Sequence, residues 1–462
     1  MSYRILIPTF VLTLQMAMGQ SLVAAERPRH VVLISVDGLS ATYFDDNRAP
    51  LPTLRSLARQ GAVAEGMITS FPSVTWPSHV SLVTGVSPGT HGVVANRVID
   101  RKTGKEITYV GDPTFTKEEC VRSPTLYDAV SAAGMTAASI IWPACNGAKT
   151  LNWVIPDSNR SSIHQRFTTP GLVEELDQAG ISIAKLGRWG WKKEFAPARD
   201  STYSRVAVHL LNRHRPNLLL LHLITPDQIE HVHGPHTEEA YWAVGNADDR
   251  IREIWEILNK SPLAGNSTLF VVSDHGFAAY DKMIYPNILF QQEGLIKLDA
   301  DGGFDEKHVW SQSSGGSAMI YLLDEANKEP LRTKVRRLLA QLEGVDRVLG
   351  FEEFKQYGLP NPAENPQQGD LIAVVKPGYA FGNDYKGTDA IEDVGSSKGT
   401  HGHLPEPHYM HATFVAAGAG IRSGTKLKTI SNLDVAPTIA RLLEVPLPTA
   451  EGRVLTEILE TR

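Results

Sequence analysis

The sequence contains little cysteine, no excess of basic residues and, after its first 25 residues, no long hydrophobic run. Only 2 of its 462 residues are cysteine, which excludes a small scaffold held together by disulfides. The 45 basic and 51 acidic side chains give a formal net charge of −6, and no basic block would attract a nucleic-acid polymer or an anionic membrane. No later run approaches the roughly 20 apolar residues of a transmembrane helix. The composition, with 42% hydrophobic residues, is that of a globular protein and leaves the oligomeric state unknown.

The N-terminal segment has the pattern of a signal peptide. Arg4 precedes an uncharged apolar run at residues 5–18, and small residues up to Ala25 follow where a signal peptidase cleaves. The alternative, an uncleaved anchor, is disfavoured because the run is shorter than a membrane span. Cleavage near Ala25 predicts a periplasmic or secreted protein. In that environment Cys120 and Cys145 could form a disulfide or remain two buried thiols, and the sequence leaves both open.

Apolar, β-branched runs that end abruptly in polar residues or glycine indicate strands. They lie at residues 31–36, 218–224, 269–272 and 412–417, with helical patterns between them at 51–60, 124–133, 238–258 and 434–443. Runs that are apolar on both faces are typical of interior strands in a parallel sheet covered by helices. We therefore expect an α/β fold, with a doubly wound, mostly parallel sheet and helices on both faces. In such sheets ligands bind outside the carboxyl ends of the strands.

The pattern changes between residues 302 and 390. A Gly-rich segment is followed there by a strand-like run at 318–323, a basic helical pattern at 330–342 and Gly-, Pro- and Asn-rich turns around 371–376. This indicates a small inserted α+β subdomain whose two ends return to the core. We expect the insertion near the substrate mouth, a catalytic core made of residues 26–301 and 391–462, and the signal peptide at 1–25.

Carboxylate and imidazole side chains follow three of the apolar runs and occupy one glycine-rich loop. Asp227 and His231 are four residues apart, so on a helical turn they would share a face and could bind one cation. Each such pattern alone is as consistent with turn residues or solvated histidines as with metal ligands. Together, oxygen and nitrogen donors without thiolates suit Zn²⁺, with Mn²⁺ or Fe as alternatives, and they are numerous enough for two metal ions. The candidate ligands are Asp37, Asp227, His231, Asp274, His275 and His401.

A candidate nucleophile lies at the start of a helical pattern. Thr75 precedes Pro77, which fits the first turn of a helix, so the Thr75 hydroxyl would stand near a helix N-terminus, where unpaired N–H groups favour an anion. By position alone, Thr75 is more often a simple N-cap. Asn96 follows in a loop and could donate an amide N–H to a phosphoryl oxygen, although a lone Asn is more often a turn residue.

The order and spacing of these motifs resemble the nucleotide pyrophosphatase/phosphodiesterase family of the alkaline phosphatase superfamily, over about residues 30–445. The motifs are Val36-Asp37-Gly38, Thr75-Trp76-Pro77-Ser78-His79, Leu82-Val83-Thr84-Gly85, His91-Gly92 to Asn96, Pro226-Asp227 with His231, Ser273-Asp274-His275-Gly276 and Gly399-Thr400-His401-Gly402.

The resemblance implies an alkaline-phosphatase-like fold and a role for each candidate residue. Asp227, His231 and His401 would hold one zinc ion. Asp37, Asp274 and His275 would hold the second. Thr75 would lie between the two ions as a metal-bound nucleophile, and Asn96 would contact the phosphoryl group.

Two positions bear on the substrate. Family members that bind nucleotides stack the base on aromatic side chains, one directly after the nucleophile and one five residues before the first metal-binding aspartate. Trp76 supplies the first, whereas His222 stands where tyrosine is usual. Both are candidate substrate-binding residues, and the departure at His222 leaves the base preference open.

The function implied by the resemblance is an exported two-zinc hydrolase that cleaves phosphodiester or pyrophosphate bonds of small phosphorylated substrates through a phospho-threonine at Thr75. A phosphomonoesterase is the nearest alternative, but no arginine lies in the nucleophile segment, and Arg97 is the one nearby candidate to bind a dianion. A phosphonoacetate-type carbon–phosphorus hydrolase is a further alternative. A catalytically silent extracellular binding protein is disfavoured, because it would have no chemical need for the complete set of ligands.

Overall fold

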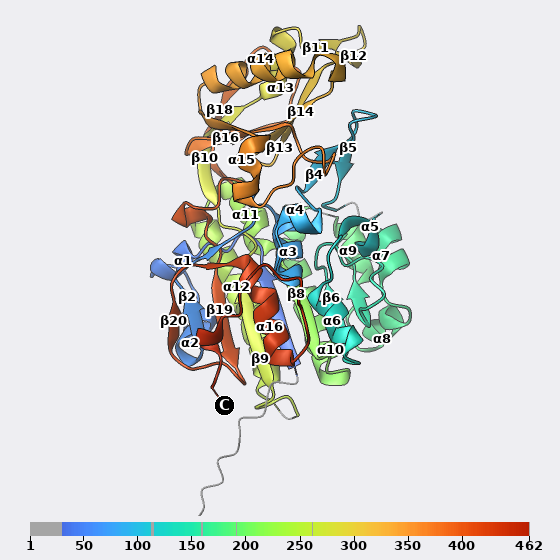
Figure 1. Ribbon diagram of the computed structural model, residues 1–462. Helices are drawn as coiled ribbons and strands as arrows, with labels where there is room; N and C mark the ends of the chain where they lie inside the picture. Colours follow the sequence, from blue (N-terminus) through green and yellow to red (C-terminus); the bar gives the residue numbers. More distant parts are fainter. Residues whose placement is uncertain (1–29, 112–114, 159, 191, 261, 462) are drawn as a thin grey trace, which may run out of the picture.

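The computed structural model describes residues 30–461 except 112–114, 159, 191 and 261. The expected signal peptide lies outside the described residues. Figure 1 shows two lobes, a large lower lobe built around a twisted sheet and a smaller upper lobe. None of the helices in the described part of the chain is long and apolar enough to cross a membrane.

The lower lobe contains an eight-stranded sheet in the order β20-β2-β19-β9-β1-β8-β6-β7. Its centre and one side are parallel, as the apolar runs predict. The strands are β1 (His30–Val36), β2 (Ala62–Ala64), β6 (Ala137–Ile140), β7 (Trp153–Ile155), β8 (Leu218–Leu223), β9 (Ser267–Val272), β19 (Phe414–Gly418) and β20 (Thr425–Leu427).

One expected parallel strand runs the other way. The run at 412–417 forms β19, which pairs antiparallel with both β9 and β2. The reason is the path of the preceding loop, in which the N–H of Ser273, just past the end of β9, donates to the carbonyl O of Thr413. The chain therefore enters β19 at the carboxyl edge of the sheet and has to run back across it.

Helices cover both faces of this sheet, as expected. One core cluster joins the sheet to α2 (Pro52–Gln60), α8 (Leu172–Gln178), α10 (Ala196–Arg213) and α12 (Glu238–Leu258). A second cluster joins the opposite face to α3 (Thr75–Thr84), α6 (Leu126–Ala132) and α16 (Val435–Leu443). Side chains alternate between the two faces of the sheet along β8, so Leu219 and Leu221 belong to the first cluster and Leu218 and Leu220 to the second. Cys120 and Cys145 are both free and buried in the structure.

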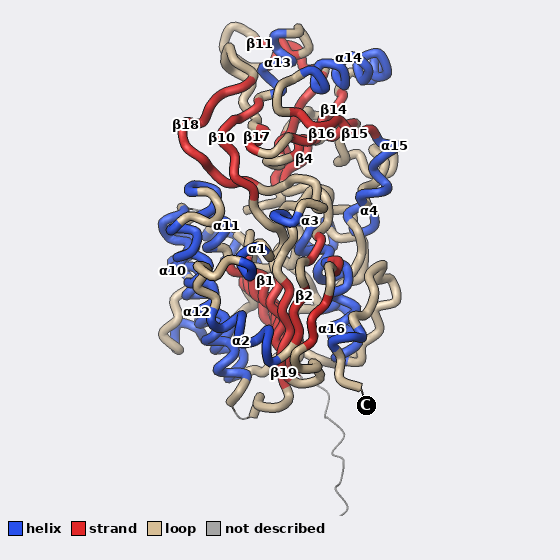
Figure 2. Tube along the Cα trace, turned by 90° about the vertical axis from the view of Figure 1, so that its left-hand side faces the viewer, coloured by secondary structure: helices blue, strands red, loops and turns tan. Residues whose placement is uncertain are grey.

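The upper lobe has a separate core cluster and two antiparallel or mixed sheets (Figure 2). Its four-stranded sheet has the order β13-β14-β16-β15 and is covered by α14 (Lys328–Gln341). The strands are β13 (Val309–Ser313), β14 (Ser317–Leu322), β15 (Val345–Gly350) and β16 (Leu371–Val375), so an apolar strand occupies the turn-rich region around 371–376. The three-stranded sheet has the order β17-β10-β18, with β10 (Ala278–Ile284), β17 (Gly378–Phe381) and β18 (Ile391–Thr400).

The three-stranded sheet connects the two lobes. β10 follows the end of β9 in the large sheet, and β18 returns the chain to the lower lobe, with Ala278 paired to Thr400. Both strands lie outside the expected insertion at 302–390, whose boundaries stay a prediction. The connection between the lobes thus lies next to three candidate ligands, Asp274, His275 and His401.

Candidate metal centre

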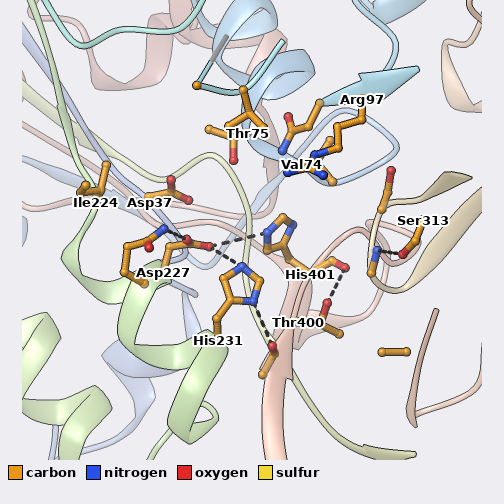
Figure 3. A pocket seen from close by; sticks show the side chains of 18 of the residues that line it. Asp37, Val74, Thr75, Arg97, Ile224, Asp227, His231, Ser313, Thr400 and His401 are labelled. Carbon is orange, nitrogen blue, oxygen red and sulfur yellow. Dashed lines mark hydrogen bonds and ion pairs between the residues drawn. The ribbon is translucent and has the colours of Figure 1, made fainter. Parts of the chain in front are cut away.

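The carboxyl edge of the large sheet positions the candidate ligands. Asp37 directly follows β1, and Asp274 and His275 follow β9. Asp227 and His231 lie on α11 (Thr225–His233), which starts just after β8. His401 comes directly after β18, and Figure 3 shows its ring turned toward Asp227 and His231. All candidate ligands therefore lie together at the edge that the strand pattern predicts.

Asp227, His231 and His401 form one group. The Nε2 atom of His231 lies 3.2 Å from Oδ1 of Asp227, and that of His401 lies 3.6 Å from the same oxygen. The other ring nitrogens face backbone carbonyls, with Nδ1 of His231 3.1 Å from the O of Gly399 and Nδ1 of His401 3.1 Å from the O of Ser73. A histidine that donates its Nδ1–H to a carbonyl leaves the Nε2 lone pair for a cation.

Asp37, Asp274 and His275 form the second group. Nε2 of His275 lies 3.3 Å from Oδ1 of Asp37 and 3.3 Å from Oδ2 of Asp274. Nδ1 of His275 faces the carbonyl O of Gly276 at 3.2 Å, which gives the same ring orientation as in the first group. The two groups adjoin, because the His275 and His401 rings stack with centroids 3.8 Å apart.

The donor atoms of both groups fit bound cations. Asp37 Oδ1, Asp227 Oδ1, Asp274 Oδ2 and His275 Nε2 are buried and make no hydrogen bond within the described part of the chain. Buried polar atoms normally have partners, and several acceptors that converge without donors are stabilised by a cation. Within each of the sets Asp227, His275, His401 and Asp37, Asp274, His275, the ligand atoms lie within 4.8 Å of one another. Imidazole and carboxylate donors without thiolate suit Zn²⁺ best.

Electrostatics in the absence of a cation supports the same interpretation. Burial, together with the neighbouring carboxylate of Asp227, raises the pKa of Asp37 well above its usual range. Burial and the charge of Asp37 raise the pKa of Asp274 to about 7. For Asp227 burial acts in the same direction, but the facing imidazoles of His231 and His401 outweigh it and lower the pKa of Asp227. The like-charged pair Asp37 and Asp274 is therefore the least stable part of the site without positive charge.

Thr75 is the first residue of α3, and its side chain points toward the space between Asp37 and His401 (Figure 3). The N-cap of this helix is Val74, which makes no side-chain cap hydrogen bond. Thr75 therefore does not occupy the N-cap position that its place in the sequence favours. Its hydroxyl lies at a helix N-terminus that suits negative charge.

Asn96 is tied to the same helix. The backbone N–H of Trp76 donates to Oδ1 of Asn96 at 2.8 Å. Asn96 and Thr75 both line the same cavity, and because the amide oxygen accepts from Trp76, the Nδ2 group is the part of Asn96 available as a donor.

The two expected substrate-binding side chains are placed differently from a pair that stacks on a base. Trp76 is only 1% exposed, packs against Tyr109 with ring centroids 5.4 Å apart, and does not line the cavity. Stacking on a base needs an exposed ring face, which the buried ring of Trp76 does not offer. His222 lines the cavity but is 2% exposed and contacts Asp37, with Nε2 3.1 Å from Oδ2.

Two buried residues at the site were not singled out by the sequence analysis. His79 directs Nδ1 at the carbonyl O of Thr75, 2.8 Å away, and lies 3.6 Å from Asp274 Oδ2. Asp157 lines the cavity two residues after β7, and burial raises its pKa to about 6. Its position after a strand is the signal that could have revealed it, but β7 has only three residues and no distinct apolar run.

The cavity in front of Thr75 has a volume of about 680 Å³ and lies between the lobes. The lower lobe supplies Thr75, Asn96 and four of the candidate ligands, Asp37, Asp227, His231 and His401. Asp274 and His275 are fully buried behind this wall. The upper lobe supplies Tyr280, Met283, Ser313, Ser314, Gly315, Ala380 and Phe381. The site can therefore hold two cations beside one hydroxyl and admit a small organic group between the lobes.

Comparisons with known proteins identify the family to which the chain is similar. Residues 31–404 match the sequence profile of the family described as type I phosphodiesterase / nucleotide pyrophosphatase. An uncharacterized pyrophosphatase/phosphodiesterase of Schizosaccharomyces pombe is 25% identical over 91% of this chain and 78% of that protein. Human ectonucleotide pyrophosphatase/phosphodiesterase family member 1 is 24% identical over 90% of this chain, which spans only 40% of that protein.

Solved structures show the same fold. Murine ectonucleotide pyrophosphatase/phosphodiesterase 5 superposes with a TM-score of 0.68 at 20% identity, over 93% of this chain and 100% of that one. An inactive threonine-to-alanine variant of the murine protein, in complex with AMP, superposes with the same TM-score over 94% of this chain. The lower lobe and its helices thus have an alkaline-phosphatase-like fold, as the motifs imply.

Proposed function

Because the chain belongs to the type I phosphodiesterase/nucleotide pyrophosphatase family, we propose that it is an exported two-zinc hydrolase that cleaves phosphodiester or pyrophosphate bonds of small organic substrates. The observation that supports this most is the convergence of buried donor atoms without hydrogen-bond partners beside the hydroxyl of Thr75. Asp227, His231 and His401 would hold one ion, and Asp37, Asp274 and His275 the other, with Thr75 as a shared ligand.

Thr75 would be the nucleophile. When bound, two zinc ions supply positive charge that polarises phosphoryl oxygens and favours an ionised hydroxyl. The Thr75 Oγ1 atom then forms a bond to phosphorus while the bond from phosphorus to the leaving oxygen breaks, and that oxygen takes up a proton. Water next attacks the phospho-threonine, the bond between phosphorus and Oγ1 breaks, and Thr75 regains its proton.

The residues around Thr75 would stabilise the phosphoryl group. The N-terminus of α3 offers the positive end of the helix dipole, while the backbone N–H of Trp76 in its first turn holds Asn96. The Nδ2 group of Asn96 would donate to a non-bridging oxygen, because Oδ1 is held by the backbone of Trp76. Both groups are part of the folded protein before substrate arrives, so they need no rearrangement during the reaction.

Phosphomonoester hydrolysis is the second candidate function, and Arg97 favours it. Arg97 lines the cavity beside Asn96 and is the first residue of β4 (Arg97–Ile99). Its side chain is 48% exposed, and Nη1 lies 3.6 Å from Oε1 of Glu106. Because Glu106 already neutralises part of this charge, diesters remain the first choice over dianionic monoesters or phosphonoacetate.

Thr75→Ala tests the central claim. We expect it to abolish turnover of aryl diesters while the purified protein keeps about two zinc ions per chain, because the six other ligands remain. Thr75→Ser is the matched control and should retain measurable turnover, since it keeps the hydroxyl. Near-normal turnover of Thr75→Ala would contradict the role of Thr75.

The substrate class is tested by comparing an aryl diester, an aryl monoester, a dinucleotide and phosphonoacetate at equal concentration. We expect kcat/KM to be highest for the diester or the dinucleotide. Predominant hydrolysis of the monoester would overturn the phosphodiesterase assignment. Absence of turnover on all four, with zinc bound, would favour a binding protein.

Export is tested on the protein itself. We expect the mass of the chain recovered from an exporting cell to correspond to cleavage near Ala25, since the first residues have the composition of a signal peptide. A mass that includes residues 1–25 would contradict this proposal.

A further inference from the structure

His222 emerges on the same face of the sheet as Asp37. Side chains alternate along β8, with Leu221 in one core cluster and Leu220 in the other, so His222 points to the Leu220 side. The neighbouring strand β1 runs parallel, with Ser35 opposite His222. Asp37 comes two residues after Ser35 and therefore lies on this side as well, one step beyond the end of the strand.

Protein acceptors face both ring nitrogens of His222. Nε2 lies 3.1 Å from Oδ2 of Asp37, and Nδ1 lies 3.3 Å from the carbonyl O of Ile141. The ring also packs against His79, with centroids 4.3 Å apart. These contacts leave neither nitrogen directed at the cavity, although the side chain forms part of its wall.

Because of the contact with His222, the two carboxylate oxygens of Asp37 have different surroundings. Oδ2 faces His222, whereas Oδ1 makes no hydrogen bond and lies 3.3 Å from Nε2 of His275. The χ2 torsion of an aspartate is broad, so an unsupported carboxylate would turn away from a fixed ligand direction. With a cation bound, Asp37 would be ionised and could only accept hydrogen bonds, so Nε2 of His222 would be the donor.

Asp274 is held in another way. The backbone N–H of Gly38 donates to Oδ1 of Asp274 at 3.2 Å, while Oδ2 is left without a hydrogen bond. Each carboxylate of this group therefore has one supported oxygen and one oxygen directed at His275. For Asp274 the support comes from the backbone, but for Asp37 it comes from a side chain that can be replaced.

We propose that His222 is a positioning residue that orients Asp37 for metal binding, in place of the substrate contact expected from its position in the sequence. The proposal presupposes the two-metal site above. It assigns the effect to one of the two ions, because Asp37 contacts His275 and Asp274 but is not among the ligands of the Asp227 group. Supporting residues of this kind typically change metal affinity 10- to 100-fold when they are replaced.

Three variants separate the two nitrogens of the ring. In His222→Gln the amide nitrogen can take the place of Nε2 and donate to Asp37. In His222→Asn the shorter amide can reach only the position of Nδ1, toward Ile141. His222→Leu fills the space without a donor. We expect His222→Gln to remain within about threefold of the unmodified protein, and His222→Asn and His222→Leu to lose about 10- to 100-fold of zinc affinity at one site.

The measurement is competition for zinc between the purified metal-free protein and a chromophoric chelator, followed by the absorption spectrum of the cobalt-substituted protein. The second, unchanged site in each variant serves as an internal control for folding. If the unmodified protein binds no metal, the proposed function fails. If it binds two ions and all three variants bind them equally well, or if His222→Gln is as weak as His222→Leu, the role of His222 is wrong.

Steady-state kinetics at saturating zinc gives a second readout. With both sites filled, we expect the KM for an aryl diester to remain within about twofold in His222→Gln, because the ring does not contact the substrate. A large rise in KM with unchanged zinc affinity would return His222 to the substrate-binding role and overturn the proposal.

Discussion

Asp274 is the residue whose ionisation should depend most visibly on bound metal. It is fully buried, and the charge of Asp37 beside it helps to raise its pKa to about 7, from an ordinary value of 3.8. Between these two values the metal-free folded protein keeps a proton on Asp274 that the unfolded chain has already released. Folding is therefore linked to proton uptake in this range of pH.

We expect the free energy of unfolding of the metal-free protein to decrease as the pH rises from about 4 to 7, because the folded state binds more protons than the unfolded state there. Urea denaturation at several pH values after chelator treatment measures this. Asp274→Asn should weaken the dependence, since its amide does not ionise, while Asp37 and Asp157, whose pKa values are also raised by burial, retain part of it. An unchanged slope in that variant would show that Asp274 is not responsible.

At the scale of residues, the acids at the ends of strands could be predicted from the sequence, but the side-chain contacts between neighbouring strands could not. Asp37 and Asp274 follow apolar runs, and the rule for parallel sheets is enough to bring them to one edge. The contact of His222 with Asp37 depends on the pairing of Ser35 with His222, which no local pattern reveals. The burial of Trp76 likewise results from Tyr109, which lies far from it in the sequence.

At the scale of elements, the hairpin of β4 and β5 (Glu106–Thr108) positions Asn96, which directly precedes it. Arg101 lies in the turn between these two strands and anchors the hairpin to the upper lobe. Its guanidinium donates to Asp370 Oδ2 at 2.7 Å, to the carbonyl O of Pro366 at 2.8 Å and to the carbonyl O of Gln368. The upper lobe thereby holds the hairpin that follows Asn96, a residue of the proposed phosphoryl site.

We expect Arg101→Met to reduce the free energy of unfolding by about 3 kcal/mol, because Asp370 is 1% exposed and would lose a charged partner. The remaining contact of Asp370 with Lys328, 3.2 Å away, keeps the loss at the lower end of the usual range. We also expect a lower kcat, since Asn96 loses its support. Denaturation and kinetics measure both effects, and Lys102→Met, in the same turn but exposed, should change neither.

Helices and strands with a clear period were predictable, whereas short or irregular ones were not. The expected helix at 238–258 is confirmed as α12, and the runs at 31–36 and 218–224 form β1 and β8. By contrast, the start of α3 at Thr75 was indicated only by Pro77 in its first turn. All of its residues are buried, including Ser78 and His79, so no polar face marks it as a helix.

At the scale of the whole molecule, ligands from separated segments of the chain meet at one edge of the sheet. Asp37, Asp227, Asp274 and His401 follow four different strands. One cation in each of the two ligand groups would therefore crosslink most of the lower lobe and the base of the upper lobe. The strand order that allows this contact, β9-β1-β8, is not the order in the sequence and could not be read from local patterns.

We expect zinc to stabilise the whole protein. At free zinc 100-fold above the dissociation constant, each occupied site should add about 2.7 kcal/mol to the free energy of unfolding. Thermal unfolding of the metal-free protein with and without two equivalents of zinc measures this as a higher Tm. Calcium, which prefers sites made only of oxygen, is the matched control and should have little effect. An equal gain with calcium would contradict an imidazole-containing site.

His401 is the last of the six candidate ligands in the chain, and it closes the group that Asp227 and His231 begin. During synthesis, the ribosome therefore makes almost the whole protein before the first group of ligands is complete. A nascent chain that already contains Thr75 would still lack a working phosphoryl-transfer centre. The late position of one imidazole would thus delay assembly of this ligand group until translation is nearly finished.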